Sequence, residues 1–435
     1  MFSERNIRMK AVESGFCKRK SKYSPVMFLD SLMEDASWHQ TKSLNQLAIN
    51  TGKKYHVSMS KQGIDWRHNP RAVRFLDMLI GEAIGRQLNA GLDVGWFDSF
   101  SRVLIKDSSE FEVSENLASE LPGIGGNSSQ AGVSIQYEFD LKSGSVNDLS
   151  INAATRSDRA DAKHTIQSVM KDDLIIRDLG YSIIHCFKEI MNKSAFFISR
   201  LDTNAGTYEK NETGTMVQLD FGKLEKSMKE QGIKGMEKQV YIGKTLLPVR
   251  LIIELMPEEV VSRRRRKTNR ANRSMGRKTS DRFKERSSFN LFITNIEATK
   301  LTAEAIADIY RSRWQIELCF KLWKGTFGID KMNPMKIERL MCLLKMRLLM
   351  ILINWEIFAY KRHEVFQKTH QLLSMIKSMK TLQENTIALK EILINQCKGL
   401  ARWIRKISEM LDSHHWLEKK KNKLGLAEIL STNVL

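Results

Sequence analysis

Residues 310–324 read Tyr-Arg-Ser-Arg-Trp-Gln-Ile-Glu-Leu-Cys-Phe-Lys-Leu-Trp-Lys. In a helix that turns by about 100° per residue, four of these side chains fall within a stripe about 60° wide, namely Tyr310, Arg313, Glu317 and Lys324. The stripe presents one carboxylate between two cations, with a phenol nearby. Such a set suits a phosphodiester, because a carboxylate can hold a metal ion and cations can hold phosphate oxygens.

The alternative interpretation is a solvated helix face that carries i,i+4 ion pairs, which is what most charge runs are. Bulky apolar residues flank the stripe within about 60° on either side, whereas an exposed face is normally polar more broadly. These flanking residues are Ile306, Ile309, Trp314 and Phe320. The spacing also resembles the Y-x2-R-x3-E-x6-K signature of DDE transposases of the IS4 family, the group that includes the Tn5 type.

The resemblance implies an RNase H fold with two further catalytic aspartates. Residues 103–107 and 174–178 are apolar runs that end in Asp107 and Asp178, and both predict short buried strands. Between them, residues 132–141 and 146–153 predict two strands joined by a turn at 143–145, and residues 158–170 predict a helix. This order matches that of RNase H. A single aspartate after a strand is more often a cap or a turn, so the interpretation depends on the combination with the signature.

The resemblance also implies the chemistry. Two divalent ions can activate the attacking oxygen and stabilise the leaving oxygen of a phosphodiester. We expect two Mg²⁺ ions, with Mn²⁺ able to substitute. Asp107 would bridge the ions, and Asp178 and Glu317 would each complete one. Phosphate contacts would come from Tyr310, Arg313 and Lys324.

The composition predicts a polyanionic partner. The chain has 70 Lys and Arg against 50 Asp and Glu, a formal charge of +20. Pro257 followed by Glu258 and Glu259 predicts a helix start, and a basic run follows. A basic run can be merely solubilising, but this one lies between the second aspartate and the glutamate. We therefore predict that it binds DNA phosphates, through Arg263, Arg264, Arg265, Arg266, Lys267, Arg270 and Arg273.

The predicted fold class is α/β: an RNase H-like core, a β-rich insertion between the second Asp and the Glu, and helical ends. Residues 1–95 are expected to form a helical head, either DNA-binding or simply packing. Residues 96–205 and 288–361 are expected to form the two parts of the core, with the insertion at 206–287. Residues 362–435 are expected to form a helical region, a possible site of dimerisation. Residues 60, 257 and 302 are expected to precede helices, and residues 239–256 to form a hairpin.

The location of the protein is expected to be the cytoplasm, in association with the nucleoid. The five cysteines show no C-x-x-C spacing, so neither a zinc site nor a disulfide framework is indicated. Residues 1–22 are charged and resemble no signal peptide. Residues 337–358 are apolar but contain five charged side chains, so they predict a core helix and not a membrane span.

The expected activity is therefore cleavage at transposon ends followed by strand transfer. The partners would be double-stranded DNA, as inverted repeats and as target, and a second copy of the chain. The rivals are an RNase H-like nuclease without strand transfer and a domesticated relative that only binds DNA. Inverted repeats beside the coding sequence would discriminate among them.

One departure from the family concerns a stacking residue. Tn5-like enzymes resolve the second strand through a DNA hairpin and hold a flipped base with a tryptophan before the signature. The matching position here is Asn290, with Phe289 one residue earlier. We expect a hairpin that depends on Phe289 or on Trp314.

Overall fold

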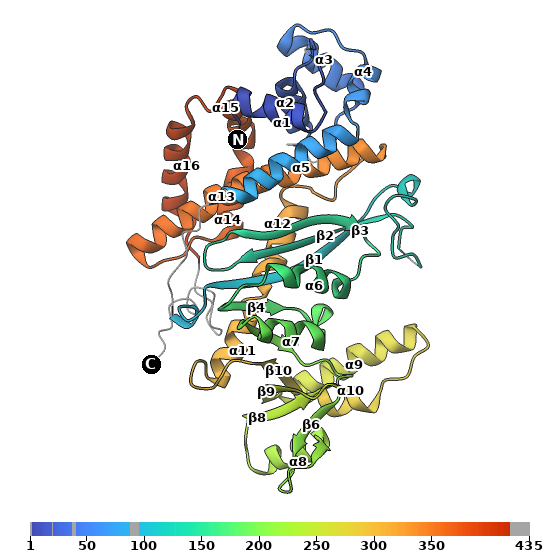
Figure 1. The fold of residues 1–435 in the computed structure, drawn as a ribbon, viewed down its shortest axis with the longest axis vertical. Helices are drawn as coiled ribbons and strands as arrows, with labels where there is room; N and C mark the ends of the chain where they lie inside the picture. Colours follow the sequence, from blue (N-terminus) through green and yellow to red (C-terminus); the bar gives the residue numbers. More distant parts are fainter. Residues whose placement is uncertain (1, 20, 37–40, 88–94, 127, 418–435) are drawn as a thin grey trace. The chain divides into compact units, whose positions relative to one another are not determined.

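The structure is a computed structural model that describes all residues except 1, 20, 37–40, 88–94, 127 and 418–435 (Figure 1). The chain divides into two compact units. The first unit comprises Met1–Leu92, Ser108–Arg156 and Gln315–Ala427, and the second comprises chiefly Asp93–Asp107 and Ser157–Trp314. The chain passes from the second unit to the first directly after Asp107 and again directly after Trp314, so both crossings lie in regions predicted to be catalytic.

The N-terminal part of the first unit is helical, as predicted. Its helices are α1 (Glu4–Glu13), α2 (Pro25–Ala36), α3 (Leu44–Tyr55), α4 (Lys61–Arg67) and α5 (Pro70–Gly85). Ser60 caps α4, because its side chain accepts a hydrogen bond from the backbone N–H of Gly63 at 3.0 Å. The predicted cap at Ser60 is therefore confirmed.

The C-terminal part of the first unit contains the long core helix. Its helices are α12 (Trp314–Gly325), α13 (Ile337–Thr369), α14 (Met375–Glu384), α15 (Thr386–Ile394) and α16 (Leu400–His414). Helix α13 packs along α5 and α2 (Figure 1). It runs eleven residues beyond the predicted end at 358, and it buries Arg347, whose guanidinium donates to the carbonyl of Lys331 at 2.8 Å. No described helix is long and apolar enough to span a membrane.

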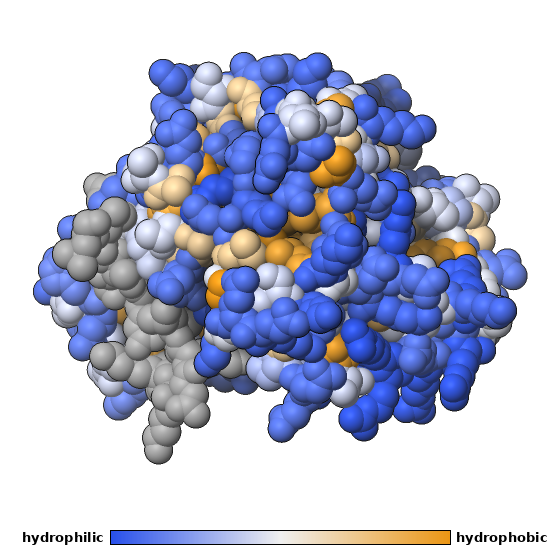
Figure 2. Space-filling model, turned by 90° about the horizontal axis from the view of Figure 1, so that it is seen from below, coloured by the Kyte–Doolittle hydropathy of each residue, from blue (hydrophilic) through white to orange (hydrophobic). Residues whose placement is uncertain are grey.

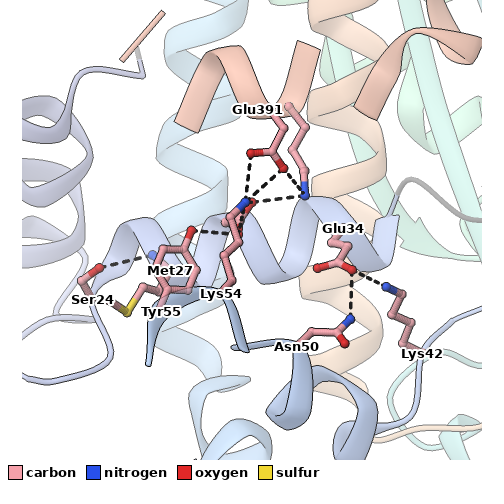
Figure 3. Close-up of polar contacts among 10 residues, drawn as sticks. Ser24, Met27, Glu34, Lys42, Asn50, Lys54, Tyr55 and Glu391 are labelled. Carbon is pink, nitrogen blue, oxygen red and sulfur yellow. Dashed lines mark hydrogen bonds and ion pairs between the residues drawn. The ribbon is translucent and has the colours of Figure 1, made fainter. Parts of the chain in front are cut away.

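A cluster of charged side chains around the buried Asp30 joins α2 and α3 to α15 (Figure 3). Asp30 accepts hydrogen bonds from the hydroxyl of Tyr55 at 2.8 Å and from Nζ of Lys54 at 3.1 Å. Nζ of Lys390 lies 3.3 Å from Asp30, and Glu391 pairs with both lysines. The head and the C-terminal helices of the first unit are therefore held together by ion pairs as well as by apolar packing.

The first unit also contains the hairpin of β2 (Gly132–Asp140) and β3 (Val146–Ala153), which pair antiparallel. Gly144 sits in the turn with φ +79°, a conformation that glycine adopts without strain. Its carbonyl accepts a hydrogen bond from Nε1 of Trp355 on α13 at 2.6 Å. Both strands and their turn match the prediction.

The second unit is built on a mixed sheet. Strands β1 (Arg102–Glu112, as far as Asp107), β4 (Asp173–Arg177) and β5 (Phe196–Arg200) are parallel neighbours. The sheet continues antiparallel through β10 (Phe289–Thr294), β9 (Leu247–Leu255), β8 (Gly235–Ile242), β6 (Thr207–Lys210) and β7 (Met216–Gln218). The predicted hairpin before the basic helix is confirmed as β8 and β9, which begins four residues earlier than expected.

The chain order β1, β2, β3, α6 (Asp158–Thr165), β4, α7 (Ile184–Asn192) and β5 is that of an RNase H-like core. The remaining helices of the second unit are α8 (Phe221–Glu230), α9 (Glu258–Ser274), α10 (Asp281–Arg286) and α11 (Ala303–Arg311). Helix α6 ends five residues before the predicted position. Just beyond it, the carboxylate of Asp173 accepts a hydrogen bond from the backbone N–H of Met170 at 2.7 Å, so the chain enters β4 early.

The cysteines differ in exposure. Cys186, Cys319 and Cys342 are buried, whereas Cys17 and Cys397 are partly exposed.

Candidate active site

The register of β1 and β4 brings two predicted aspartates to the same sheet edge. The last paired residues are Lys106 and Arg177, and the next residue on each strand is Asp107 and Asp178. The side chain of Asp107 is 19% exposed and that of Asp178 is 43% exposed. Both aspartates directly follow the last parallel pair of β1 and β4, and α/β sheets bind ligands at the carboxyl ends of their parallel strands; their partial exposure leaves both carboxylates accessible to a substrate.

Strand β1 itself departs from the prediction. It does not end at Asp107 but continues to Glu112. Just after the C-terminal end of this strand, the backbone N–H of Val113 donates a hydrogen bond to the carbonyl of Ala131 at 3.2 Å. Asp107 therefore lies within β1 and not at its end.

Arg313 binds both aspartates. Its Nη1 lies 3.1 Å from Oδ2 of Asp107, and its Nε lies 3.9 Å from Oδ1 of Asp178. A planar guanidinium can contact two carboxylates at once. One cation therefore compensates two like charges that would otherwise repel each other at the sheet edge.

Tyr310 supports the same cluster. Its hydroxyl donates to Oδ1 of Asp178 at 3.3 Å, and its ring packs against Phe292. Burial, followed by the negative charge of Asp178, raises the pKa of Tyr310 well above its usual value. The phenol therefore stays protonated at neutral pH and acts as a hydrogen-bond donor.

The signature does not lie on one continuous helix, contrary to the prediction. Helix α11 ends at Arg311 and α12 begins at Trp314. At the break, the hydroxyl of Ser312 donates to the carbonyl of Ile309 at 2.6 Å, and the backbone N–H of Arg313 bonds to the carbonyl of Tyr310. Such i−3 bonds tighten and bend the chain, so the 60° stripe calculated for an ideal helix does not apply here.

Glu317 and Lys324 belong to α12 and to the first unit. Glu317 lies in the first turn of α12 and is partly buried. Lys324 lies in its last turn, where Nζ donates to the carbonyl of Glu110 at 2.7 Å. Trp314, predicted to flank the stripe on a buried side, is 48% exposed.

Sequence reasoning missed Arg200. It is the exposed last residue of β5 and pairs in register with Phe292 of β10. Its positive charge partly opposes the rise in the pKa of Tyr310 and, after burial, helps to lower the pKa of Arg264. The only signal in the sequence was a cation that follows a buried strand, which by itself is too common to single out.

The carboxylates of the site determine whether it could bind a metal ion. In the part of the chain that the structure describes, no group of three or more His, Cys, Asp or Glu side chains could hold a metal ion. Within the second unit, however, Asp107 and Asp178 share one cation, the guanidinium of Arg313. Two carboxylates around one positive charge are a donor set that suits a hard, oxygen-binding ion.

The basic helix forms where predicted, with Pro257 preceding its first turn. Its predicted DNA-binding residues divide into two groups. Arg264 donates to the carbonyl of Phe289 at 2.9 Å, and Arg265 donates to Oγ of Ser287 at 2.7 Å. The exposed group, on one side about 120° wide, consists of Arg263, Arg266, Lys267, Arg270 and Arg273. Seen from below, the surface is mostly hydrophilic, with hydrophobic residues near the centre of the view (Figure 2).

Phe289 cannot stack on a base in this structure. It is only 3% exposed and packs in the apolar core of the second unit, where its ring lies 6.1 Å from that of Phe221. Asn290 is bonded to Glu254 at 3.0 Å. Of the two aromatic residues proposed for this role, only Trp314 is accessible.

An RNase H-like core with paired carboxylates at the sheet edge defines a class of enzymes that act on nucleic acid backbones. A family model described as "Transposase DDE domain" matches residues 98–353, more than half of the chain. The chain belongs to this family of DDE transposases, enzymes that act on DNA, and the predicted class is confirmed. The family uses divalent metal ions.

Individual relatives agree with the family. The transposase for insertion sequence element IS231B of Bacillus thuringiensis subsp. berliner is 29% identical, over 94% of this chain and 90% of that protein. The transposase for IS1151 of Clostridium perfringens is 28% identical, over 88% of this chain and 84% of that protein. Among solved structures, a piggyBac transposase synaptic complex with hairpin DNA aligns with a TM-score of 0.48 and 11% identity, over 98% of this chain and 86% of that one.

Proposed function

We propose that the protein mobilises an IS4-type insertion sequence by hydrolytic cleavage at the ends of the element and transfer of the freed strand into target DNA. The observation that supports this most directly is the arginine-bridged pair Asp107 and Asp178 at the sheet edge. The relatives named above are transposases for insertion sequence elements and match along nearly their whole length.

Asp107, Asp178 and Glu317 would together hold two Mg²⁺ ions, and Mn²⁺ would substitute. When bound, such ions lower the pKa of the attacking water or hydroxyl and stabilise the leaving oxygen. All three side chains offer only oxygen donors, which is what Mg²⁺ requires. The assignment of Glu317 rests on its position in the signature.

The surrounding side chains have separate roles in this proposal. Tyr310 orients Asp178 through its hydroxyl, and Arg313 holds both aspartates in position. Arg200, exposed near Tyr310, is placed to contact a phosphate oxygen. Lys324 supplies a further cation on α12.

DNA is held outside the catalytic carboxylates by the exposed side of α9, whose cations contact phosphates without reading sequence. The helical head, residues 1–95, and the C-terminal helices are proposed to bind transposon ends and to form the dimer that holds two ends together.

The test uses purified protein and a duplex that carries one terminal inverted repeat taken from the DNA flanking the gene. We expect Mg²⁺-dependent nicking at the end of the repeat, and joining of the 3′ end to a plasmid. The variants Asp178→Asn and Glu317→Gln should bind the duplex as the wild type does but leave it uncut.

Two results would contradict the proposal. A Glu317→Gln protein that nicks at the wild-type rate would exclude its role as a metal ligand. Wild-type protein that nicks without ever joining strands would indicate a nuclease instead.

A further inference from the structure

The residue directly before Asp107 is a lysine buried in an ion pair. Lys106 is 0% exposed, and its Nζ lies 2.7 Å from Oδ2 of Asp161 on α6, which is 1% exposed. Charged groups are costly to remove from water unless they are paired. Because neither group reaches solvent, neither can contact DNA, and any effect of the pair on the reaction must pass through the residues beside it.

Lys106 and Asp107 lie on opposite faces of the sheet, because successive side chains of a strand alternate. Leu104, on the same face as Lys106, belongs to the apolar core cluster that contains Phe187 of α7. The carboxylate of Asp107 instead contacts Arg313, which follows α11. The ion pair with α6 therefore holds β1 from the face opposite to the carboxylate.

The same helix also contacts the segment that follows Asp178. Helix α6 packs on the turn Leu179–Tyr181, where Tyr181 shares a small apolar cluster with Ala162 of α6. A Cβ at position 180 would lie 2.6 Å from Oδ2 of Asp158, and glycine permits this close approach. Helix α6 is therefore joined to β1 by an ion pair just before Asp107, and to the chain just after Asp178 by packing.

Stability alone does not account for a buried ion pair at this position. Replacing such a pair with apolar residues of similar volume is often neutral or stabilising. An ion pair differs from an apolar contact in that it fixes the direction and the length of the contact. Ligands of a metal ion must be held within about 0.5 Å of their working geometry, and supporting residues do this.

We propose that Lys106 and Asp161 are positioning residues that set the separation of Asp107 and Asp178, and thereby the affinity of the site for Mg²⁺. This inference rests on the proposed function, because it takes the two aspartates as ligands of the ions.

The experiment compares the wild type with the double variant Lys106→Met and Asp161→Leu, which replaces the ion pair with an apolar pair. Each single substitution would leave one buried charge unpaired and would lower stability for that reason alone. The double variant should keep a melting temperature close to that of the wild type. It should need about tenfold more Mg²⁺ for half-maximal nicking of a duplex with one terminal inverted repeat, as substitution of residues that support metal ligands typically does. Added Mg²⁺ should also raise its melting temperature by less than it raises that of the wild type.

Arg102→Gln is the matched control, because Arg102 also makes an ion pair between β1 and β4. Its Nε donates to Oδ1 of the buried Asp173 at 2.9 Å, at the other end of the two strands. This end lies about 17 Å along β1 from Asp107. The control should lower the melting temperature and leave the Mg²⁺ requirement of nicking as it is in the wild type.

A second variant decides the question if the double variant does not fold. Asp161→Glu keeps both charges but moves the carboxylate by one methylene group, so it too should raise the Mg²⁺ requirement. The inference is overturned if the folded double variant, or Asp161→Glu in its place, shows the Mg²⁺ requirement and the Mg²⁺-induced thermal shift of the wild type. Wild-type protein that neither nicks the duplex nor gains stability from Mg²⁺ would instead refute the proposed function, and this inference with it.

Discussion

At the scale of single residues, Arg313 determines the charge balance of the site. It places one guanidinium between two carboxylates, and the cluster that it forms with Asp107, Asp178 and Tyr310 lies entirely within the second unit. Removing the cation would leave two like charges close together, a cost that a bound metal ion could offset.

This predicts a stronger effect of metal ions on stability when the arginine is absent. Arg313→Gln should lower the melting temperature without divalent ions, and added Mg²⁺ should raise it by more than it raises that of the wild type, because ligand binding to the folded state stabilises it. Differential scanning fluorimetry with and without Mg²⁺ measures both shifts. Equal Mg²⁺ shifts in the two proteins would show that the carboxylates beside Arg313 do not bind the ion; Arg313→Gln combined with Asp178→Asn serves as the control.

At the scale of elements, α9 has two sides with different tasks. Arg264 and Arg265 fasten the helix to β10 and to the segment before it, whereas the other basic residues face solvent. The helical pattern alone cannot assign these tasks, because residues 263–267 all carry the same charge.

The two sides of α9 should therefore respond differently to substitution. Arg263→Gln with Arg266→Gln should reduce the salt slope of DNA binding by about 0.9 for each phosphate left without its cation and leave the melting temperature unchanged. Arg264→Gln should lower the melting temperature, because the carbonyl of Phe289 and the side chain of Asn290 lose a buried donor. The interpretation fails if the outward pair leaves the slope unchanged, or if Arg264→Gln leaves stability unchanged.

The helical head should lose stability in acid through His68. Burial, followed by the positive charge of Arg339, lowers the pKa of His68 to about 4. The unfolded histidine titrates near pH 6.5. Since the folded-state pKa is depressed, the unfolded chain binds the extra proton, and the stability is complete above about pH 6.5 and is lost as the pH falls towards 4.

The size of this loss is at most roughly 3 kcal/mol. Urea unfolding at pH 7 and pH 4.5 should show a smaller pH dependence for His68→Gln than for the wild type. His414→Gln, at an exposed position, should keep the wild-type dependence. If the free energy of unfolding depended on pH equally in the wild type and both variants, the pKa of His68 would not differ between the folded and unfolded states.

At the scale of the whole molecule, a formal charge of +20 opposes association of two copies. DNA would remove this repulsion. We therefore predict that the protein is monomeric without DNA and that two copies assemble on transposon ends. Light scattering of the complex measures the stoichiometry, and a single copy that cleaves and joins an end would contradict the prediction.

Sequence patterns predicted most elements because apolar periodicity and caps are local signals. The hairpin of β2 and β3, the cap at Ser60 and the start of α9 at Pro257 all depend on neighbouring residues only. The break at Ser312 was missed because a side-chain bond to the backbone overrides helical periodicity there.

Other misses came from contacts between distant segments. Phe289 is buried by the apolar core of the second unit, and Arg200 is brought towards Tyr310 by the neighbouring strands β5 and β10. Neither relation is visible along the chain. The two aspartates were proposed from the apolar runs that precede them together with the signature, and the parallel pairing of β1 with β4 places them on neighbouring strands.

The uneven exposure of the cysteines makes the native chain suitable for chemical labelling. Burial raises the pKa of Cys342 to about 12 and also raises the pKa of Cys186 and that of Cys319. Because the thiolate is the reactive form, these three thiols should not react with maleimide. Cys17 and Cys397 are partly exposed; Cys17 lies between α1 and α2, and Cys397 lies between α15 and α16. A dye at each position, without any engineered cysteine, would report from the helical head and from the segment between α15 and α16, and transposon-end DNA bound by the head, as proposed, should slow the reaction of Cys17.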